Sequence, residues 1–517
     1  MQAISLGHAG ILIRARGVTI VCDPWFVPAF FGSWFVFPRN DQLPDDIMHD
    51  VCNPDFLYVS HLHGDHFDSS FLAEKMSKNT TVLLPDFPTR ELERSFNSLG
   101  FRKFERTVNA SERDIAPGVT IAIHVESSIT DGPAGDSALV VSDGEARLVN
   151  QNDCRTNDLT ALRSHGPVDL HWLQYSGAIW YPMVYDMDPT EKKQLCDEKV
   201  ESQFSRALRY VEALNATTVV PSAGPPCFLD DELFGLNVIT GDEASIFPDQ
   251  TEFQRRMSNE GRLNAATTIP GTRFTVLGGG VTVEQPMSGD ELSRIFTNKL
   301  EYLRAYQADW ADWLAAEKAS WASPDTDIIA TLKLWWEPLM ALGVSVRQGI
   351  GANALITAGD LSIYVNFFDG LVEEHAGQPY SYSFTIPRAL LERVVAQRAI
   401  DWSNSLFLSC RFTAWREGAY NEYLYNFLKS LSVERMTRTE SEAKQRLQGI
   451  PSDESDITIG EYVVQRRCPH RNADLSVFGE IEGDNLVCTL HGWKFDLETG
   501  QCRNAAEKAI RVRKRDA

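Results

Sequence analysis

With 517 residues the chain is longer than one hydrophobic core usually organises, so we expect several domains. Its residues are 43% hydrophobic and 23% charged, as in globular proteins, and no apolar run reaches the ~20 residues that span a bilayer. The formal net charge of −22 argues against a nucleic-acid-binding surface and is compatible with a redox partner that presents a basic face.

The N-terminus and the cysteines indicate a reducing compartment. The opening residues MQAISLGHAGILIRARG lack the basic-then-apolar layout of a signal peptide, so a cytoplasmic location is expected. Nine cysteines scattered over the chain do not make a disulfide framework. Only Cys468, Cys488 and Cys502 lie close together in the sequence.

Residues 1–287 have the pattern of strands alternating with helices. Residues 11–25 predict a hairpin that turns at Gly17, and residues 56–66 predict an apolar strand that runs into a polar loop. Further strands are expected at 81–85, 101–105, 119–126, 137–143 and 145–154, and helices at 69–77, 89–100 and 198–216. Strand clusters before and after helices predict a sandwich of sheets with helices outside.

Residues 288–450 are expected to form an α+β domain. A long helix is predicted over 288–321, and hairpin-like strands at 343–350, 352–370 and 381–386. The stretch 438–456 is charged and polar and contains a proline, which predicts a linker. A separate domain over 451–517 would follow it.

The C-terminal residues contain Cys468-x-His470 and Cys488-x-x-His491. A Rieske [2Fe–2S] cluster needs two thiolates on one iron and two imidazoles on the other, so two tight loops must each supply one Cys and one His. These four residues are therefore the predicted cluster ligands. A zinc site made by the same four residues is the alternative.

The residues around these ligands favour the cluster over zinc. Residues 480–490 predict a hairpin that turns at Gly483-Asp484 and brings the two loops face to face. Pro469 and the run HGWKFDLETG at 491–500 resemble the loops of Rieske oxygenases. We therefore expect a small all-β Rieske domain at 451–517, with Cys502 outside the ligand set.

A second metal motif, His61-x-His63-x-Asp65-His66, follows the apolar strand that begins at residue 56. In such a loop the first two histidines converge on one metal ion and the Asp-His pair serves a second. The alternative is a set of surface histidines without function. The motif, GHAG at 7–10 and DPW at 23–25 resemble the metallo-β-lactamase superfamily. Residues 1–287 are thus expected to adopt the αββα metallo-β-lactamase fold, with Asp65 and His66 acting in catalysis.

The resemblance implies further ligands. Asp153 stands where that superfamily has its bridging aspartate, after a buried strand. His124, at the end of a predicted strand, is a candidate third histidine of the first site; Asp136 competes with it, and a strand-end histidine without metal is the alternative. The superfamily's last histidine should follow the strand at 217–221, but PSAGPPCF at 221–228 contains none.

The two metal motifs together indicate a redox enzyme. A Rieske cluster moves single electrons, and Rieske oxygenases hold their O₂-activating iron on two histidines and one carboxylate. The histidines outside the motifs show no paired spacing with a carboxylate: His8, His49, His165, His171 and His375. The loop from His61 to His66 is therefore the expected destination of the electrons.

Several strips of the sequence resemble CMP-N-acetylneuraminate hydroxylase, over roughly residues 1–440. They lie at 148–159, 175–183, 219–228, 267–280 and 400–428. This resemblance implies a Rieske-dependent iron monooxygenase. In that family the Rieske domain precedes the metallo-β-lactamase unit, whereas here it follows, and ITDGPAGDSALVV at 129–141 replaces the family's histidine pattern.

We therefore expect a monooxygenase that hydroxylates a C–H bond or oxygenates an amine of a small molecule. Its cofactors would be the [2Fe–2S] cluster and one or two non-haem irons rather than zinc. Its partners would be O₂ and an external electron donor, such as a ferredoxin, a reductase or a cytochrome b5-like protein, and a homo-oligomer is compatible with this. A metallo-hydrolase with a redox-sensing Rieske domain, and an O₂ or NO reductase, are the alternatives.

Overall fold

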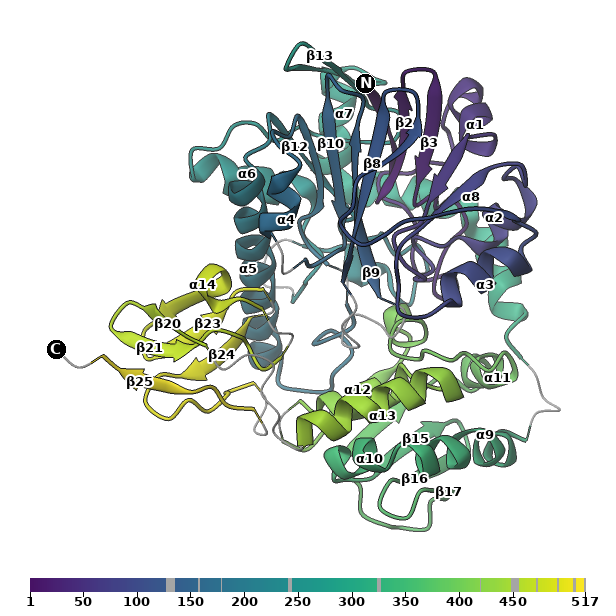
Figure 1. Cartoon of the computed structure of the whole chain (residues 1–517). Helices are drawn as coiled ribbons and strands as arrows, with labels where there is room; N and C mark the ends of the chain where they lie inside the picture. Colours follow the sequence, from purple (N-terminus) through teal and green to yellow (C-terminus); the bar gives the residue numbers. More distant parts are fainter. Residues whose placement is uncertain are drawn as a thin grey trace. The chain divides into compact units, whose positions relative to one another are not determined.

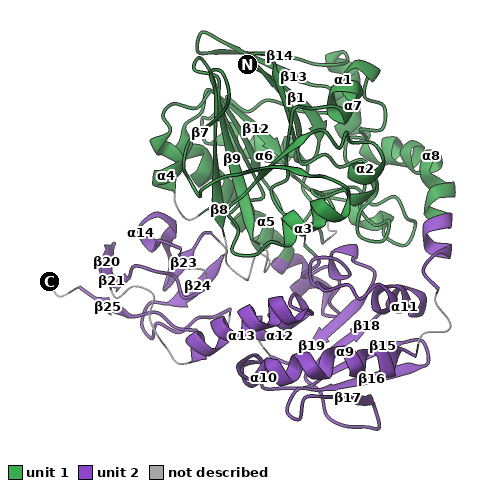
Figure 2. Ribbon diagram, turned by 45° about the vertical axis from the view of Figure 1, so that its right-hand side comes forward, with its two compact units in different colours: residues 1–127, 134–179, 196–315 green, residues 128–133, 180–195, 316–517 purple. Residues whose placement is uncertain are grey.

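In the computed structural model the chain forms two compact units (Figure 2). The first comprises residues 1–127, 134–179 and 196–315, and the second 128–133, 180–195 and 316–517. The structure describes residues 1–126, 135–156, 159–177, 179–239, 244–322, 327–418, 420–447, 455–470, 473–490, 492–504 and 508–515. Within these ranges no helix combines the length and the apolar character needed to cross a membrane.

Two sheets form the framework of the first unit (Figure 1). One has the strand order β14-β13-β1-β2-β3-β4-β5-β6, with bounds β14 Gly280–Glu284, β13 Arg273–Leu277, β1 Gln2–Gly7, β2 Gly10–Ala15, β3 Val18–Cys22, β4 Phe56–Tyr58, β5 Thr81–Leu84 and β6 Lys103–Arg106. The other has the order β12-β11-β10-β9-β8-β7, with bounds β12 Thr218–Ser222, β11 Leu170–Gln174, β10 Arg147–Asn152, β9 Asp136–Ser142, β8 Val119–Glu126 and β7 Arg113–Ala116.

Apolar side chains from both sheets share one core. Ile13, Tyr58, Leu139, Trp172 and Phe274 are among its members, and all five are buried. Because these residues come from strands of both sheets, the two sheets pack face to face. The period-two alternation of the strands places the apolar residues on this inner face.

Helices cover the outer faces of the sandwich (Figure 1). A second apolar cluster joins the first sheet to α1 (Asp45–Cys52), α2 (Ser69–Glu74) and α3 (Glu91–Ser98). On the other side of the unit lie α4 (Leu159–Ser164), α6 (Gln250–Asn259) and the part of α5 (Pro189–Leu214) that begins at Cys196. The order helix, sheet, sheet, helix confirms the predicted αββα metallo-β-lactamase fold.

Several predicted elements of this unit are confirmed. The hairpin at Gly17 joins β2 to β3, with Ala15 opposite Val18 and a φ of 84° at the glycine. The apolar strand before the second metal motif is β4, which runs parallel to β3 and β5. Polar loops follow the carboxyl ends of β4 and β10, which is where α/β sheets commonly place their ligands.

The helix predicted over 288–321 is interrupted. It consists of α7 (Gly289–Thr297) and α8 (Lys299–Ala319), and Asn298 between them has non-helical backbone angles. Leu303 and Tyr306 of α8 pack in a cluster with Phe35 and Cys227. This packing explains why the first compact unit continues past the predicted boundary at 287–288 to Ala315.

The second unit contains an α+β part with the strand order β17-β16-β15-β18-β19. The bounds are β15 Ala354–Ala358, β16 Leu361–Asn366, β17 Leu371–Glu374, β18 Tyr382–Thr385, β19 Thr413–Arg416, α9 Ile328–Leu342, α10 Val344–Ile350, α11 Arg388–Ala396, α12 Glu422–Leu428 and α13 Val433–Leu447. The hairpin predicted at 352–370 is confirmed as β15 and β16.

Two predictions for this part are wrong. Residues 343–350, expected as a strand, form α10, because Val346 and Ile350 are one helical turn apart and both are buried. The linker expected at 438–456 is helical up to Leu447, where α13 buries Thr439 and Ala443 on one face. Residues 448–454 lie outside the described ranges.

The C-terminal residues form two three-stranded sheets, β20-β21-β25 and β22-β23-β24. Their bounds are β20 Asp456–Ile459, β21 Tyr462–Gln465, β22 Gly479–Glu482, β23 Asn485–Cys488, β24 Trp493–Asp496 and β25 Val512–Lys514, with the short helix α14 at Leu475–Phe478. The hairpin predicted at Gly483-Asp484 is confirmed, with Glu482 opposite Asn485. The small all-β domain is thus as predicted.

The buried His171 makes the first unit sensitive to acid. It lies on β11, its Nε2 is 2.9 Å from Oε1 of Gln151, and burial lowers its pKa to about 3. An unfolded histidine has a pKa of about 6.5, so the unfolded chain binds the extra proton as the pH falls through that value. We expect His171 to remove up to about 1.4 kcal/mol of stability per pH unit below that pH.

The measurement is urea unfolding between pH 7 and pH 5 of the wild type and of His171→Asn. The slope of the unfolding free energy against pH gives the number of protons taken up on unfolding, and this number should be smaller by about one in the variant. His49→Ala removes a histidine from the exposed face of α1 and is the matched control. Equal pH dependence in the wild type and His171→Asn would contradict the prediction.

Candidate metal centre

The loop after β4 turns tightly on itself. The backbone N–H groups of His66 and Phe67 both donate to the carbonyl of His63, at 3.0 and 2.7 Å. His61, Asp65 and His66 are buried, with exposed fractions of 2%, 4% and 0%. The local turn therefore directs three polar side chains into the protein interior.

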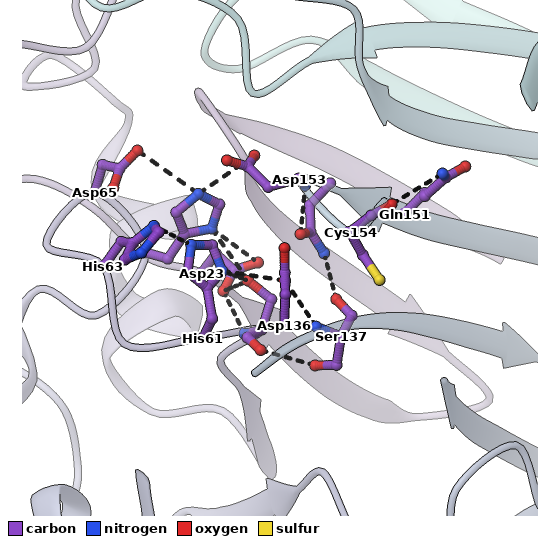
Figure 3. Close-up of polar contacts among 12 residues, drawn as sticks. Asp23, His61, His63, Asp65, Asp136, Ser137, Gln151, Asp153 and Cys154 are labelled. Carbon is purple, nitrogen blue, oxygen red and sulfur yellow. Dashed lines mark hydrogen bonds and ion pairs between the residues drawn. The ribbon is translucent and has the colours of Figure 1, made fainter. Parts of the chain in front are cut away.

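Two groups of side chains among the described residues have possible ligand atoms within 4.8 Å of one another. One group is His61, His66 and Asp153, and the other is His8, Asp65 and His66. Figure 3 shows Asp65 and Asp153 reaching toward the same imidazole ring from opposite sides, with His61 and His63 close by. Nε2 of His66 lies 3.5 Å from Asp153 Oδ1 and 3.7 Å from Asp65 Oδ2.

His63 joins this cluster through His61. Its Nδ1 is 2.8 Å from Nε2 of His61, and the two rings meet edge to face. Burial and the neighbouring His61 lower the pKa of His63 well below its usual range. Its imidazole is therefore neutral at physiological pH, which is the form that binds metal ions.

The acidic residues and His66 influence each other's charge. Although burial opposes the shift, His66 and His8 lower the pKa of Asp65. Burial favours a lower pKa for His66, but Asp153 and Asp65 outweigh it and raise the pKa of His66 well above its usual range. The site therefore favours positive charge beside two buried carboxylates, a place that a metal cation would also suit.

Buried polar atoms with incomplete bonding indicate that the residues fit a metal ion. Asp65 Oδ1 is buried without a hydrogen-bond partner among the described residues, and His66 Nε2 and Asp153 Oδ1 face each other at 3.5 Å, too far for a good hydrogen bond. Leaving buried polar atoms unsatisfied is costly, and a cation would satisfy all three. Imidazole and carboxylate ligands suit non-haem iron and also zinc.

Ser60 and Asp23 orient the histidines from behind. Asp23 Oδ1 accepts hydrogen bonds from the backbone N–H of Ser60 at 2.7 Å and from its hydroxyl at 3.0 Å. The Ser60 hydroxyl lies 2.9 Å from Nδ1 of His61 and 3.2 Å from Nδ1 of His66. The second ring nitrogen of both histidines is thus held, which fixes how the first one points.

The two candidates for a further ligand lie differently. Asp136 Oδ1 is 3.3 Å from Nδ1 of His61, so its carboxylate belongs to the polar groups behind this ring (Figure 3). His124 lies with its Nε2 2.9 Å from Nε2 of His165, whose other ring nitrogen contacts Glu112. Among the described residues, His124 belongs to neither of the two groups of possible metal ligands.

Strand geometry explains the position of His124. Its neighbours on β8, Ile121 and Ile123, belong to the core between the sheets. Because side chains alternate along a strand, His124 points to the opposite face. The sequence identified the strand correctly but did not give the direction of this side chain.

His8 is the site residue that the sequence did not predict. It stands in the turn between β1 and β2, and its Nε2 is 3.0 Å from Oδ2 of Asp65. No local spacing pairs it with a carboxylate, because its partner is 57 positions away. The only sequence signal was its place in the GHAG turn.

A basic side chain, Arg206, lies near Asp153, and Lys199 lies near Arg206. Burial, Arg155 and Arg206 lower the pKa of Lys199 to about 8. Burial and Arg155 lower the pKa of Arg206 to about 9, while Asp153 acts in the opposite direction. Lys199 and Arg206 are seven residues apart on α5, which places them on one face of that helix.

Of the predicted cluster ligands, Cys488 is the last residue of β23, and Cys468 and His470 lie in the loop that follows β21. Cys468 and Cys488 are both fully buried. The ring of His470 stacks on Trp493, with 4.0 Å between centroids and 11° between planes. His491 lies outside the described residues.

Known proteins support this description of the chain. A Rieske [2Fe-2S] domain model matches residues 453–513, and a model described as "Rv3818-like, SCP2-like domain" matches residues 328–445. A Rieske 2Fe-2S iron-sulfur protein of Mycolicibacterium smegmatis is 42% identical over 524 residues, which cover 99% of this chain and 100% of that protein. The Rieske prediction and its [2Fe–2S] cofactor are confirmed, whereas the SCP2-like domain was not anticipated.

Two further similarities are partial. Cytidine monophosphate-N-acetylneuraminic acid hydroxylase of Pongo pygmaeus is 30% identical over 89 residues, 17% of this chain and 14% of that protein. This similarity is much shorter than the strips at 1–440 suggested. The solved structure of CmlA, a diiron beta-hydroxylase from Streptomyces venezuelae, matches with a TM-score of 0.33 and 16% identity, covering 51% of this chain and 52% of that chain.

The hydrogen bonds of Ser60 predict a measurable effect on metal binding. We expect Ser60→Ala to weaken the affinity of the centre for Fe²⁺ by about 10- to 100-fold, because two histidines lose the group that orients them. Metal content after dialysis against graded chelator measures this. Ser98→Ala removes an exposed hydroxyl from the end of α3 and should change nothing; equal affinities in the two variants would contradict the role of Ser60.

Proposed function

This chain belongs to the family of the Rieske 2Fe-2S iron-sulfur protein of Mycolicibacterium smegmatis, and from that premise we propose that it is an O₂-dependent, Rieske-coupled monooxygenase. The observation that carries the proposal is a buried centre of histidines and carboxylates in a chain that also has a Rieske domain. The cluster transfers single electrons, which hydrolysis does not require. Non-haem iron at the centre would give these electrons a use.

The chain's own residues would divide between two metal positions. His61 Nε2 and His63 Nδ1 face one another and suit the first position. Asp65 and His66 suit the second, and Asp153 lies within reach of the same ring of His66. A set of two histidines and one carboxylate is the arrangement that non-haem iron oxygenases use.

Bound iron would supply the activation of O₂ with electrons that arrive from the cluster. In the overall reaction one oxygen atom enters the substrate and the other leaves as water, with two electrons and two protons consumed. The protein residues keep the ligands in place: Ser60 and Asp23 hold the rings, and burial keeps His63 neutral. Burial of His61 and His66 also limits access of water to the centre.

The substrate would be a small organic molecule, hydroxylated at carbon or oxygenated at nitrogen. The partial similarity to a cytidine monophosphate-N-acetylneuraminic acid hydroxylase supports hydroxylation. The electrons would come from a ferredoxin, a reductase or a cytochrome b5-like protein. With a net charge of −22, the chain would favour a donor with a basic docking face.

Metal analysis of anaerobically purified protein tests the proposal. We expect iron beyond the two atoms of the cluster, with a separate Mössbauer signal. His61→Ala should keep the optical spectrum of the cluster, lose the additional iron and lower reductant-driven O₂ consumption by more than about 100-fold, the upper end for substitutions outside the ligand set. Cys468→Ser should lose the cluster and O₂ consumption while the additional iron remains.

His49→Ala serves as the matched control, because its side chain is exposed on α1. Three results would overturn the proposal. The first is zinc alone in the centre, with hydrolysis that continues anaerobically. The second is O₂ consumption with no oxygenated product in the presence of extracts or compound libraries. The third is unchanged iron content in His61→Ala.

A further inference from the structure

The first unit lacks a histidine at the place where its fold would bring the last metal ligand. β12 ends at Ser222 and is followed by Ala223 and Gly224, and none of these residues is a metal ligand of the usual kind. A side chain at Gly224 would also collide with the ring of Tyr175, because an added Cβ would lie 2.3 Å from its Oη. These residues therefore supply no imidazole or carboxylate to the centre.

His8 lies against this same loop. The backbone N–H of Ala223 donates to the carbonyl of His8 at 3.0 Å, although the two residues are far apart in the sequence. The side chain of His8 is 5% exposed and points to Asp65, with 3.0 Å between Nε2 and Oδ2. The ring also meets the ring of His66 at 5.5 Å between centroids. One turn thus brings an imidazole to the position that the loop after β12 leaves without one.

The backbone of this turn is built for one geometry. His8 has a φ of 50°, a region that few residues other than glycine adopt and that stores strain. Gly7 before it has a φ of 93°, and an added Cβ would lie 2.6 Å from Val36. Such strain is commonly kept where a side chain must point in one particular direction.

Neighbouring side chains hold the turn. Asn40 is buried and donates to the carbonyls of Leu6 and Trp25, at 3.0 and 2.8 Å. The ring of Trp25 meets the ring of His8 edge to face at 5.0 Å. The imidazole of His8 is therefore held by packing against Trp25 and by the constrained backbone of its turn.

From this arrangement we propose that His8 is a metal ligand, and that with Asp65 and His66 it forms the second metal position of the centre. The inference rests on the proposed iron centre and adds a residue to it. Two ligand atoms bound to one ion at about 2.1 Å lie roughly 3 Å apart, which matches the separation of His8 Nε2 and Asp65 Oδ2. One ring nitrogen binds one ion, so His66 in this position leaves His61, His63 and Asp153 for the other.

The position is thus completed from the opposite end of the sequence. The hydrolase pattern takes its last ligand from the loop after a late strand, whereas this chain takes it from the first turn. Replacing a ligand from the loop after β12 by His8 keeps the number of ligands the same. A chain of this kind can hold two ions despite the missing histidine at 221–228.

The experiment measures uptake of Co²⁺ alone by the full chain with its cluster intact, by equilibrium dialysis and by the visible absorption of the bound ion. We expect the wild type to bind two ions per chain and His8→Ala to bind one, with the second weakened by more than 100-fold. His49→Ala, which removes an exposed histidine, should bind two. Far-ultraviolet circular dichroism and the cluster spectrum establish that the variant is folded.

A measurement on the wild type keeps the inference testable if His8→Ala does not fold. In the Co²⁺-loaded wild type, the ring protons of His8 should carry a large hyperfine shift in proton NMR, assigned with labelled histidine. Two ions bound by His8→Ala with wild-type affinity, one ion bound by the wild type, or an unshifted His8 ring would each overturn the inference. Failure of the wild type to bind any ion would instead contradict the proposed centre itself.

Discussion

The burial of carboxylates beside imidazoles is the constraint on which the first unit depends. Asp65 and Asp23 are 4% and 0% exposed, and moving such charges out of water is expensive unless a positive charge compensates them. The raised pKa of His66 provides part of that compensation. Asp65 Oδ1 is buried and has no hydrogen-bond partner among the described residues, which indicates that the imidazoles alone do not complete the compensation. The metal ion of the proposed centre would therefore stabilise the fold as well as serve the chemistry.

This constraint explains the unusual construction around the centre. The turn of His63, the left-handed backbone of His8 and the fixed hydroxyl of Ser60 each cost conformational freedom or strain. Such costs persist only where surrounding packing holds the geometry. Here the two sheets supply that packing, because their shared core includes Tyr58, immediately before the metal loop, and Leu148 on β10, the strand that leads to Asp153. The packing of the two sheets thus holds the strained geometry of the site.

The sequence predicted the features that depend on residues close together in the chain, and it did not predict those that depend on distant residues. The motif from His61 to His66 and the hairpin at Gly483 depend on neighbours in the chain, so spacing was sufficient to identify them. The contact of His8 with Asp65 joins residues 57 positions apart, and the direction of His124 depends on which face of β8 packs inward. The V-x-V pattern at 344–346 resembles a strand, yet burial of Val346 and Ile350 on one side made it helical. Tertiary packing decided each of these cases.

The charge of the whole chain and the charge at the site act over different distances. At physiological salt, screening limits the reach of surface charge to about 8 Å, so a net charge of −22 governs encounters at the surface. Arg206 is buried, where screening is weak, and it places positive charge near Asp153. The acidic surface would therefore favour the basic donor that we propose, whereas the positive charge of Arg206 would favour negatively charged groups beside the centre. The net charge of the chain therefore bears on the proposed donor and gives no information about what the centre itself accepts.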